Sequence, residues 1–340
     1  MPSLMETEAA EAPAAIARLL AAEPERWRFL GRRLAAFPPA FLATVARGSS
    51  DHAASYLGYL TTARLGRVTA SLPLSLITLH AAPLAMRGAL AVAISQSGQS
   101  PDLVETLIAC RAAGAETVAL VNDTAAPLGR AAVWCFGLQA GQERAVAATK
   151  SMLASLAAAA LLVAEWAGDA ALSAALAALP EALSAAAAAD WSAAVAPLAA
   201  AERMMVVGRG LSQPIAQEAA LKLKETAGLH AEAISAAEVR HGPMALLGPG
   251  YPVLVFATRG PALASILAAA AEMRASGATV LLAAPAECAE RALTIPETGH
   301  PALDPLAALA CFYRLAARIA GARGLDPDHP RHLHKITRTR

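Results

Sequence analysis

Three segments of the chain recur in the same order at a nearly constant spacing, and this repeat limits the possible folds more than any other feature. LATVARGSSDHAA at 42–54 matches MMVVGRGLSQPIA at 204–216, and ALAVAISQSGQS at 89–100 matches YPVLVFATRGPA at 251–262, both 162 residues apart. CRAAGAETVALV at 110–121 matches MRASGATVLLAA at 273–284 with a one-residue gap. The pattern predicts two copies of one structural unit.

Each copy alternates short apolar runs with helical patterns, which is typical of a parallel sheet covered by helices on both faces. The first copy is expected to hold strands at 42–46, 67–72, 90–94, 117–121 and 133–137 and helices at 51–64 and 101–113. The second is expected to hold strands at 204–208, 253–257 and 279–283 and helices at 214–227 and 261–275. The alanine-rich stretch 151–200 is expected to form linking helices with a break at Pro180, and the segment after Gly324 to be extended.

Charge and hydropathy exclude several classes of protein. The 28 Lys and Arg residues nearly cancel the 27 Asp and Glu residues, so no broad basic surface for nucleic acid is expected. Glu6, Glu8 and Glu11 make the N-terminus unlike a secretory signal. The apolar run 151–166 is shorter than the roughly 20 residues of a membrane span and is expected to be a buried or interface helix. We therefore expect a cytoplasmic protein with no nucleic-acid or membrane partner.

Neither the cysteines nor the histidines form a metal-binding pattern. The four cysteines are scattered without a CxxC pair, which favours buried free thiols. His230, Glu232, Glu238 and His241 lie close together in the sequence, but they do not form an HExxH helix. No metal ion is expected.

Serine-rich turns follow two strands of the first copy, where a parallel α/β sheet binds its ligands. Ser49 and Ser50 follow the first strand, and the segment SQSGQS at 95–100 follows the third. Hydroxyls and backbone N–H groups at helix N-termini predict a phosphate site, and Gly98 lets the backbone approach the ligand. Alternatively, these serines are only helix caps and turn formers. The matching turn at 257–260 lacks serines, so we expect one half to bind a ligand and the other to be structural.

A second cluster of polar residues lies between 218 and 243. Glu218, Lys222 and Glu225 fall on one face of the expected helix. They form either a surface salt-bridge ladder or a base whose pKa a neighbouring lysine adjusts. The histidines that follow could carry protons near neutral pH.

Six segments together carry a family resemblance: ARGSSDHAA (46–54), SQSGQSPD (95–102), GQERAVAATKS (141–151), EAALKLKE (218–225), HAEAISAAEVRHGPMAL (230–246) and DPDHPRHLHK (326–335). Over about residues 40 to 340, the chain resembles the isomerase portion of glutamine–fructose-6-phosphate amidotransferase (glucosamine-6-phosphate synthase) and the shorter amino-sugar deaminases and isomerases that lack its glutaminase domain. The resemblance implies two tandem α/β sugar-isomerase (SIS) domains, each a flavodoxin-like parallel sheet between helices (an α-β-α sandwich). We expect an N-terminal helical segment at 1–34, SIS domains at 35–175 and 176–325, and an extended tail at 326–340 that reaches the active site.

The same resemblance assigns residues to a sugar-phosphate site. The sugar phosphate and nearby hydroxyls would be held by Ser49, Ser50, Ser95, Gln96, Ser97 and Ser100. Val146 and Ala147 would line the sugar through backbone groups.

The resemblance also implies four catalytic residues. Glu225 would be the base that carries a proton between C1 and C2. His241 would help to open the sugar ring from the partner subunit of a homodimer. Lys222 would support the charge of the enediol. Lys335 would approach the carbonyl and could form an imine with an open-chain ketose.

These roles imply interconversion of a hexosamine 6-phosphate, glucosamine 6-phosphate in the first instance, and fructose 6-phosphate with release of ammonia, without a cofactor. Simple aldose–ketose isomerisation, cleavage of a fructosamine 6-phosphate conjugate and a non-catalytic sugar-phosphate sensor are the alternatives. Pro2 stands where the synthase has its nucleophilic cysteine, so glutamine-dependent synthesis is not expected. Ala148 replaces a usual serine, and Pro101-Asp102 replaces small residues after the serine turn. These departures bear on specificity.

Overall fold

The computed structural model describes residues 2–335 as two compact units, each built on one parallel five-stranded sheet. Among the described residues, the amino-terminal unit comprises Ala14–Glu143, Lys150–Ala177, His334 and Lys335. The carboxyl-terminal unit comprises 2–13, Arg144–Thr149 and Ala178–Leu333. The domain bounds expected from the sequence stay a prediction, and residues 336–340 of the expected tail lie outside the described residues.

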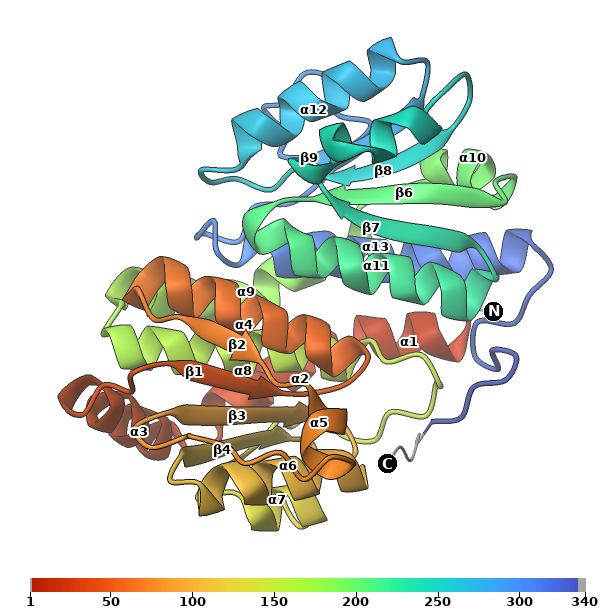
Figure 1. Ribbon diagram of the computed structural model, residues 1–340. Coiled ribbons are helices and arrows are strands. Elements are labelled where there is room, and N and C mark those ends of the chain that lie inside the picture. The colour runs from red at the N-terminus through yellow and green to blue at the C-terminus, as the bar shows by residue number, and fades with distance from the viewer. Residues whose placement is uncertain (1, 336–340) are drawn as a thin grey trace. The chain divides into compact units, whose positions relative to one another are not determined.

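The sheet of the amino-terminal unit has the strand order β2-β1-β3-β4-β5, all parallel. Its strands are β1 (Leu42–Val45), β2 (Thr69–Ser71), β3 (Leu90–Ser95), β4 (Glu116–Val121) and β5 (Trp134–Gly137). Its helices are α2 (Ala12–Ala21), α3 (Pro24–Ala36), α4 (Ser49–Leu65), α5 (Leu74–Thr78), α6 (Pro101–Ala112), α7 (Pro127–Ala131) and α8 (Lys150–Ala167). Helices α4 and α8 cover one face, and α6 and α7 cover the other (Figure 1).

The sheet of the carboxyl-terminal unit has the order β10-β9-β8-β6-β7. Its strands are β6 (Arg203–Gly208), β7 (His230–Ser235), β8 (Pro252–Phe256), β9 (Thr279–Ala284) and β10 (Leu293–Thr294). Its helices are α1 (Leu4–Ala10), α10 (Val195–Ala199), α11 (Gln213–Ala227), α12 (Leu263–Ala275) and α13 (Asp304–Ala322), with 3₁₀ turns η1 (Ser192–Ala194), η2 (Gly210–Ser212), η3 (Glu238–His241) and η4 (Pro243–Leu246). Helix α12 lies on one face, and α11 with α13 lies on the other (Figure 1).

The two sheets have the same connectivity. Read from β7, the second sheet runs second, first, third, fourth and fifth strand, as the first does from β2. This is the flavodoxin-like order, so the predicted pair of α/β repeats is confirmed. The aligned glycines also share a backbone conformation, with φ of +55° at Gly48 and +58° at Gly210.

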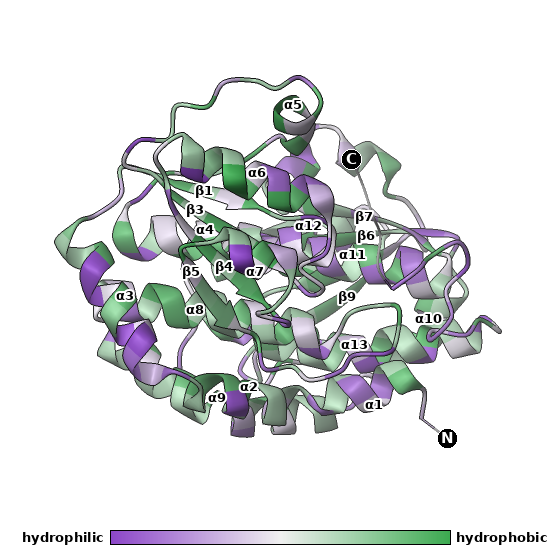
Figure 2. Cartoon of the chain, turned by 90° about the horizontal axis from the view of Figure 1, so that it is seen from below, coloured by the Kyte–Doolittle hydropathy of each residue, from purple (hydrophilic) through white to green (hydrophobic). Residues whose placement is uncertain are grey.

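Apolar side chains between sheet and helices hold each unit together. In the amino-terminal unit, Val45 and Ala91 on the strands pack with Leu103 and Leu107 of α6. In the carboxyl-terminal unit, Met205, Val207, Val253, Val255, Ile266 and Met273 form the matching core under α12. Strands β3 and β4 are drawn largely in green in Figure 2, because strands buried on both faces carry continuous apolar runs.

Two alanine-rich helices are long and apolar enough to cross a membrane by length and composition alone. They are α8 and α9 (Ala170–Ala188), and 89% of the apolar window of α8 is buried inside the fold. The core-helix interpretation of 151–166 is therefore confirmed. The predicted break at Pro180 is wrong, because α9 runs through it. The helices instead divide at Gly168, whose φ of +61° suits glycine, and Asp169 accepts a hydrogen bond from the backbone N–H of Leu172 (3.1 Å).

Candidate functional site

The serine-rich turns of the amino-terminal unit lie where the sheet changes direction. Strands β1 and β3 are neighbours, and the chain leaves β1 toward β2 through α4 but leaves β3 toward β4 through α6. The helices therefore diverge from this point, and α/β sheets of this kind bind ligands beyond the carboxyl ends of such strands. Ser49, Ser50 and the segment 95–100 lie here, which brings the predicted phosphate residues together at one edge.

The turn after β3 is fixed by its own hydrogen bonds. Ser95 is buried, and its Oγ accepts from the backbone N–H of Gly98 at 3.0 Å, while Ser97 Oγ accepts from the N–H of Gln99 at 3.3 Å. Gly98 has φ of +63°, and a Cβ there would lie 2.7 Å from the Cβ of Ala126. Ser95 and Ser97 thus act partly as turn formers, in a turn that presents half-buried Gln96 and Ser97 at this edge.

Two helix N-termini meet this edge. Ser100 is at the N-cap position of α6, but its hydroxyl does not cap the helix. The alternative interpretation, in which the Ser100 side chain caps the helix, is therefore wrong. Ser49 and Ser50 are the first residues of α4, and both are half-buried. Backbone N–H groups and the positive ends of two helix dipoles make this edge of the sheet favourable for an anion.

An ion pair links the two turns. Arg47, between β1 and α4, donates from Nε to Oδ2 of Asp102 in the first turn of α6 at 3.0 Å. The Asp102 side chain is fully buried, whereas half of the Arg47 side chain is exposed. Asp102 therefore holds a guanidinium group beside the serine turn. Nearby, burial raises the pKa of the Asp51 carboxyl above its ordinary value.

The equivalent edge of the carboxyl-terminal unit is filled by its own side chains. Arg259 forms two hydrogen bonds to the Asp304 carboxylate, at 2.7 and 2.8 Å, and a third to Glu297 at 2.7 Å. Ser212 Oγ and Thr258 Oγ1 lie 2.7 Å apart. This arrangement favours the expected asymmetry, in which the second copy serves structure.

The polar row on α11 is buried. Lys222 is 1% exposed, and its Nζ lies 3.6 Å from Oε1 of Glu218, which is fully buried, and in hydrogen-bond contact with Glu225. Tyr313 on α13 donates from its hydroxyl to Glu218 at 3.3 Å. The surface-ladder interpretation is therefore wrong, because α13 covers this face of the helix. A buried lysine between two carboxylates fixes the side chain of Glu225 in place.

Glu225 is the end of this row that reaches solvent. Its side chain is 19% exposed and lines a cavity of about 320 Å³. The opposite wall is formed by the segment that follows α13, including Asp326 and His329. Asp326 accepts a hydrogen bond from His329 at 2.8 Å, which raises the pKa of that histidine above its ordinary value. A carboxylate that is fixed on one side and open on the other suits a proton carrier.

His241 is exposed at the end of η3, after β7. Strand β7 was not predicted, because its sequence HAEAIS places polar residues at alternate positions. As an edge strand it exposes His230 and Glu232. His230 therefore lies on β7 and His241 in η3, and the side chain of His241 is exposed to solvent.

The expected sugar-lining segment is held by a carboxylate that the sequence interpretation did not use. Glu8 on α1 is buried, and it accepts hydrogen bonds from the backbone N–H groups of Arg144 (2.6 Å) and Ala145 (3.0 Å). These bonds fix the backbone immediately before Val146 and Ala147. Glu8 and Arg144 are 136 residues apart, so no local pattern could have shown the contact.

The C-terminal segment is also anchored by side chains. Both carboxylate oxygens of Asp328 accept from the first backbone N–H groups of α1, those of Leu4 and Met5, at 2.7 Å each. Lys335 donates from Nζ to Glu143 at 3.0 Å. Glu143 lies in the segment GQERAVAATKS (141–151), but the sequence did not predict that it binds Lys335.

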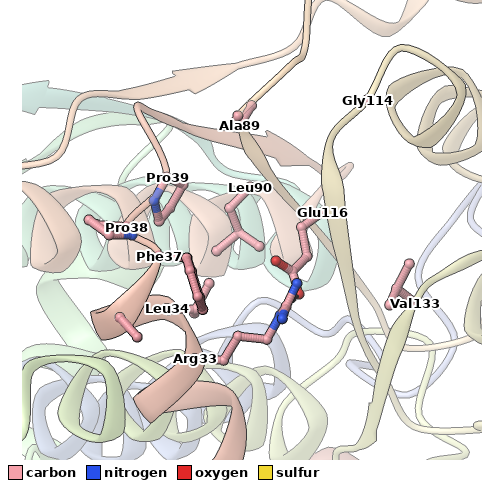
Figure 3. A pocket seen from close by; sticks show the side chains of 12 residues that line it. Arg33, Leu34, Phe37, Pro38, Pro39, Ala89, Leu90, Gly114, Glu116 and Val133 are labelled. Carbon is pink, nitrogen blue, oxygen red and sulfur yellow. Dashed lines mark hydrogen bonds and ion pairs between the residues drawn. The ribbon is translucent and has the colours of Figure 1, made fainter.

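A larger cavity, of about 640 Å³, lies at the opposite edge of the first sheet. It is lined by the amino ends of β3 and β4, where Arg33 donates from Nε to Glu116 at 2.7 Å (Figure 3). None of the predicted site residues lines it. Volume alone therefore does not identify the site. Within residues 2–335, no group of three or more His, Cys, Asp or Glu side chains is placed to hold a metal ion.

Comparison with known proteins identifies the family. A family model of the SIS domain matches residues 42–165 and 197–284, more than half of the chain. The chain belongs to the SIS domain family. A protein of known structure from Silicibacter pomeroyi DSS-3, provisionally named a phosphosugar isomerase, is 41% identical to this SIS-domain protein, with a TM-score of 0.91 over 96% of this chain and 100% of that one.

Two further proteins are similar to the SIS-domain protein, one in sequence and one in fold. The isomerizing glutamine–fructose-6-phosphate aminotransferase of Aeropyrum pernix is 38% identical over 263 residues, 72% of this chain and 42% of that protein. The C-terminal domain of glucosamine-fructose-6-phosphate aminotransferase from Francisella tularensis shares the fold at 24% identity, with a TM-score of 0.86 over 97% of this chain and 99% of that one. The chain spans about half the length of the curated relatives it matches.

Proposed function

We propose that this SIS-domain protein is a phosphosugar isomerase that deaminates a hexosamine 6-phosphate, converting glucosamine 6-phosphate and water into fructose 6-phosphate and ammonia. The observation that carries the proposal is Glu225, a carboxylate held by buried Lys222 and open to a cavity. The names of the relatives, an isomerizing fructose-6-phosphate aminotransferase and a phosphosugar isomerase, support a sugar phosphate as substrate.

In this proposal, the turns after β1 and β3 bind the phosphate. Ser49, Ser50, Ser95, Gln96, Ser97 and Ser100 supply hydroxyl, amide and backbone donors at two helix N-termini. The phosphate is a remote handle whose binding energy orients the reacting carbons. Val146 and Ala147 line the sugar on a segment that Glu8 fixes.

The chemistry then requires one mobile proton. Once His241 has helped the ring to open, Glu225 takes the proton from C2 of the aldose and returns it to C1. Lys222 supplies positive charge near the enediolate-like intermediate. The product carries an imine at C2, which adds water and releases ammonia as the ketose forms. Lys335 approaches this carbon from the C-terminal segment.

A panel of sugar phosphates tests the proposal. We expect the purified chain to release ammonia and fructose 6-phosphate in equal amounts from glucosamine 6-phosphate, with the two products scored separately. Ketose formation from glucose 6-phosphate without ammonia release from the amino sugar would instead favour simple isomerisation. Release of an amino acid from a fructosamine 6-phosphate conjugate would favour deglycation. Binding of several sugar phosphates without turnover would favour the sensor.

We further propose that the protein acts in the cytoplasm as a homodimer with shared active sites. If His241 serves the partner subunit, chains carrying His241→Ala and Glu225→Ala are each inactive alone. Mixing them under conditions of subunit exchange is expected to restore about a quarter of the wild-type activity, because half of the dimers then hold one intact site. A dimer that regains no activity after demonstrated exchange would contradict the shared site.

A further inference from the structure

Glu143 is a carboxylate held inside the amino-terminal unit. Its side chain is fully buried. The backbone N–H of Ser151 donates to Oε1 at 3.1 Å, and the hydroxyl of Ser151 donates to Oε2 at 2.5 Å. Ser151 is the second residue of α8, so the carboxylate lies at the N-terminus of an 18-residue helix, where a negative charge is favoured. Both oxygens are thereby fixed in position.

The third donor to Glu143 comes from the end of the described chain. Lys335 Nζ lies 3.0 Å from Oε2, the oxygen that also accepts from the Ser151 hydroxyl. The Lys335 side chain is 23% exposed, so most of it is withdrawn from water. A charge-assisted hydrogen bond to a buried, preoriented carboxylate is stronger than one between exposed side chains.

The backbone around Lys335 does not fix its side chain, so the position of the ammonium group depends on the contact with Glu143. Residues 325–335 contain neither a helix nor a strand. A backbone without regular hydrogen bonds does not fix a long lysine side chain, which has many rotamers. A buried partner that is itself held by a helix can restrict that freedom.

We propose that Glu143 is the positioning residue for Lys335: its buried carboxylate, anchored on the first turn of α8, receives the ε-ammonium group and fixes where the C-terminal segment presents its lysine. The consequence for catalysis rests on the proposed function, in which Lys335 approaches the carbon that bears the imine. The positioning itself does not depend on that function. Glu143 does not act on the sugar.

The reactivity of the Lys335 amine can be measured directly, because the chain contains only four lysines: Lys150, Lys222, Lys224 and Lys335. Lys150 and Lys222 are buried, and Lys224 is exposed and serves as an internal reference. Brief acetylation of the full-length protein by an N-hydroxysuccinimide ester, read by peptide mass spectrometry, gives the rate at Lys335 relative to Lys224. Loss of the charged partner in Glu143→Gln is expected to raise this ratio about tenfold.

Two matched variants sharpen the result. Glu116→Gln removes another carboxylate of the same unit, paired with Arg33, and should leave the ratio unchanged. Ser151→Ala keeps the Glu143 charge but removes one of its anchors, and should raise the ratio by a smaller factor, even if Glu143→Gln does not fold. An unchanged ratio in both Glu143→Gln and Ser151→Ala, or an equal rise in Glu116→Gln, would overturn the proposal.

Kinetics separate the positioning from the proposed function. If the chain deaminates glucosamine 6-phosphate, Glu143→Gln should lower kcat about tenfold and leave KM within about threefold, because the phosphate handle is untouched. A wild-type protein that turns over no sugar phosphate but shows the acetylation change would refute the function and retain the positioning. An active Glu143→Gln enzyme with wild-type kcat and an unchanged ratio would refute the positioning alone.

Discussion

Replacing Glu225 with glutamine is expected to lower the rate of ammonia release from glucosamine 6-phosphate by about 1000-fold. The amide has the size of the carboxylate and can still accept the hydrogen bond from Lys222, so the fold of α11 should be preserved. It cannot carry a proton between C2 and C1. A second readout avoids the deamination step: fructose 6-phosphate incubated in deuterium oxide should exchange its C1 proton with the wild-type protein, and the variant should abolish this exchange.

Glu232→Gln is the matched control for this experiment. Glu232 is an exposed carboxylate on β7 in the same unit, and its loss should leave both rates within about twofold. The affinity of Glu225→Gln for the unreacted sugar phosphate should also change little, because the proposal assigns phosphate binding to the turns after β1 and β3. Glu225 would lose its role as the base if the variant kept more than a tenth of the wild-type exchange rate.

The sequence predicted most of the fold because the fold repeats. Glycines aligned between the copies occupy turns with positive φ, and apolar runs long enough to be buried on both faces mark β1, β3, β4, β6, β8 and β9. The unpredicted strands are less regular. Strand β7 exposes alternate residues at a sheet edge, and β10 is only two residues long. Neither has the continuous apolar run that a central strand shows.

Apart from the roles that the family resemblance implies, the residue pattern indicates the candidate site only where its residues are close in the sequence. The serine turn has a local signature, since a strand, a glycine and a helix start fall within ten residues. The face shared by Glu218, Lys222 and Glu225 also follows from helix periodicity, but its burial does not, because α13 covers it from almost 100 residues away. Glu8 binds the backbone of Arg144, and Glu143 binds Lys335, and the two residues of each pair lie more than 100 positions apart in the sequence. Such contacts depend on the fold and leave no spacing to recognise.

The second large effect is expected at Lys222, because it is the buried partner of Glu218 and also serves the proposed chemistry. Lys222→Met keeps the length of the side chain but leaves buried Glu218 without its lysine, and an uncompensated buried charge costs about 3–5 kcal/mol. We expect the free energy of unfolding in urea to fall by about 3 kcal/mol. Lys224→Met, at the exposed neighbour, should change it by less than about 0.5 kcal/mol. Equal stability of these two variants would show that the row is not an ion-pair network.

A double variant separates the two roles of Lys222. Adding Glu218→Gln to Lys222→Met removes the uncompensated charge, so most of the lost stability should return, as coupled neighbouring residues allow. The positive charge beside Glu225 remains absent, so ammonia release should stay about 100-fold below that of the wild-type protein. If activity returned together with stability, Lys222 would serve the fold alone, and the charge that stabilises the developing enediolate would have to come from another residue.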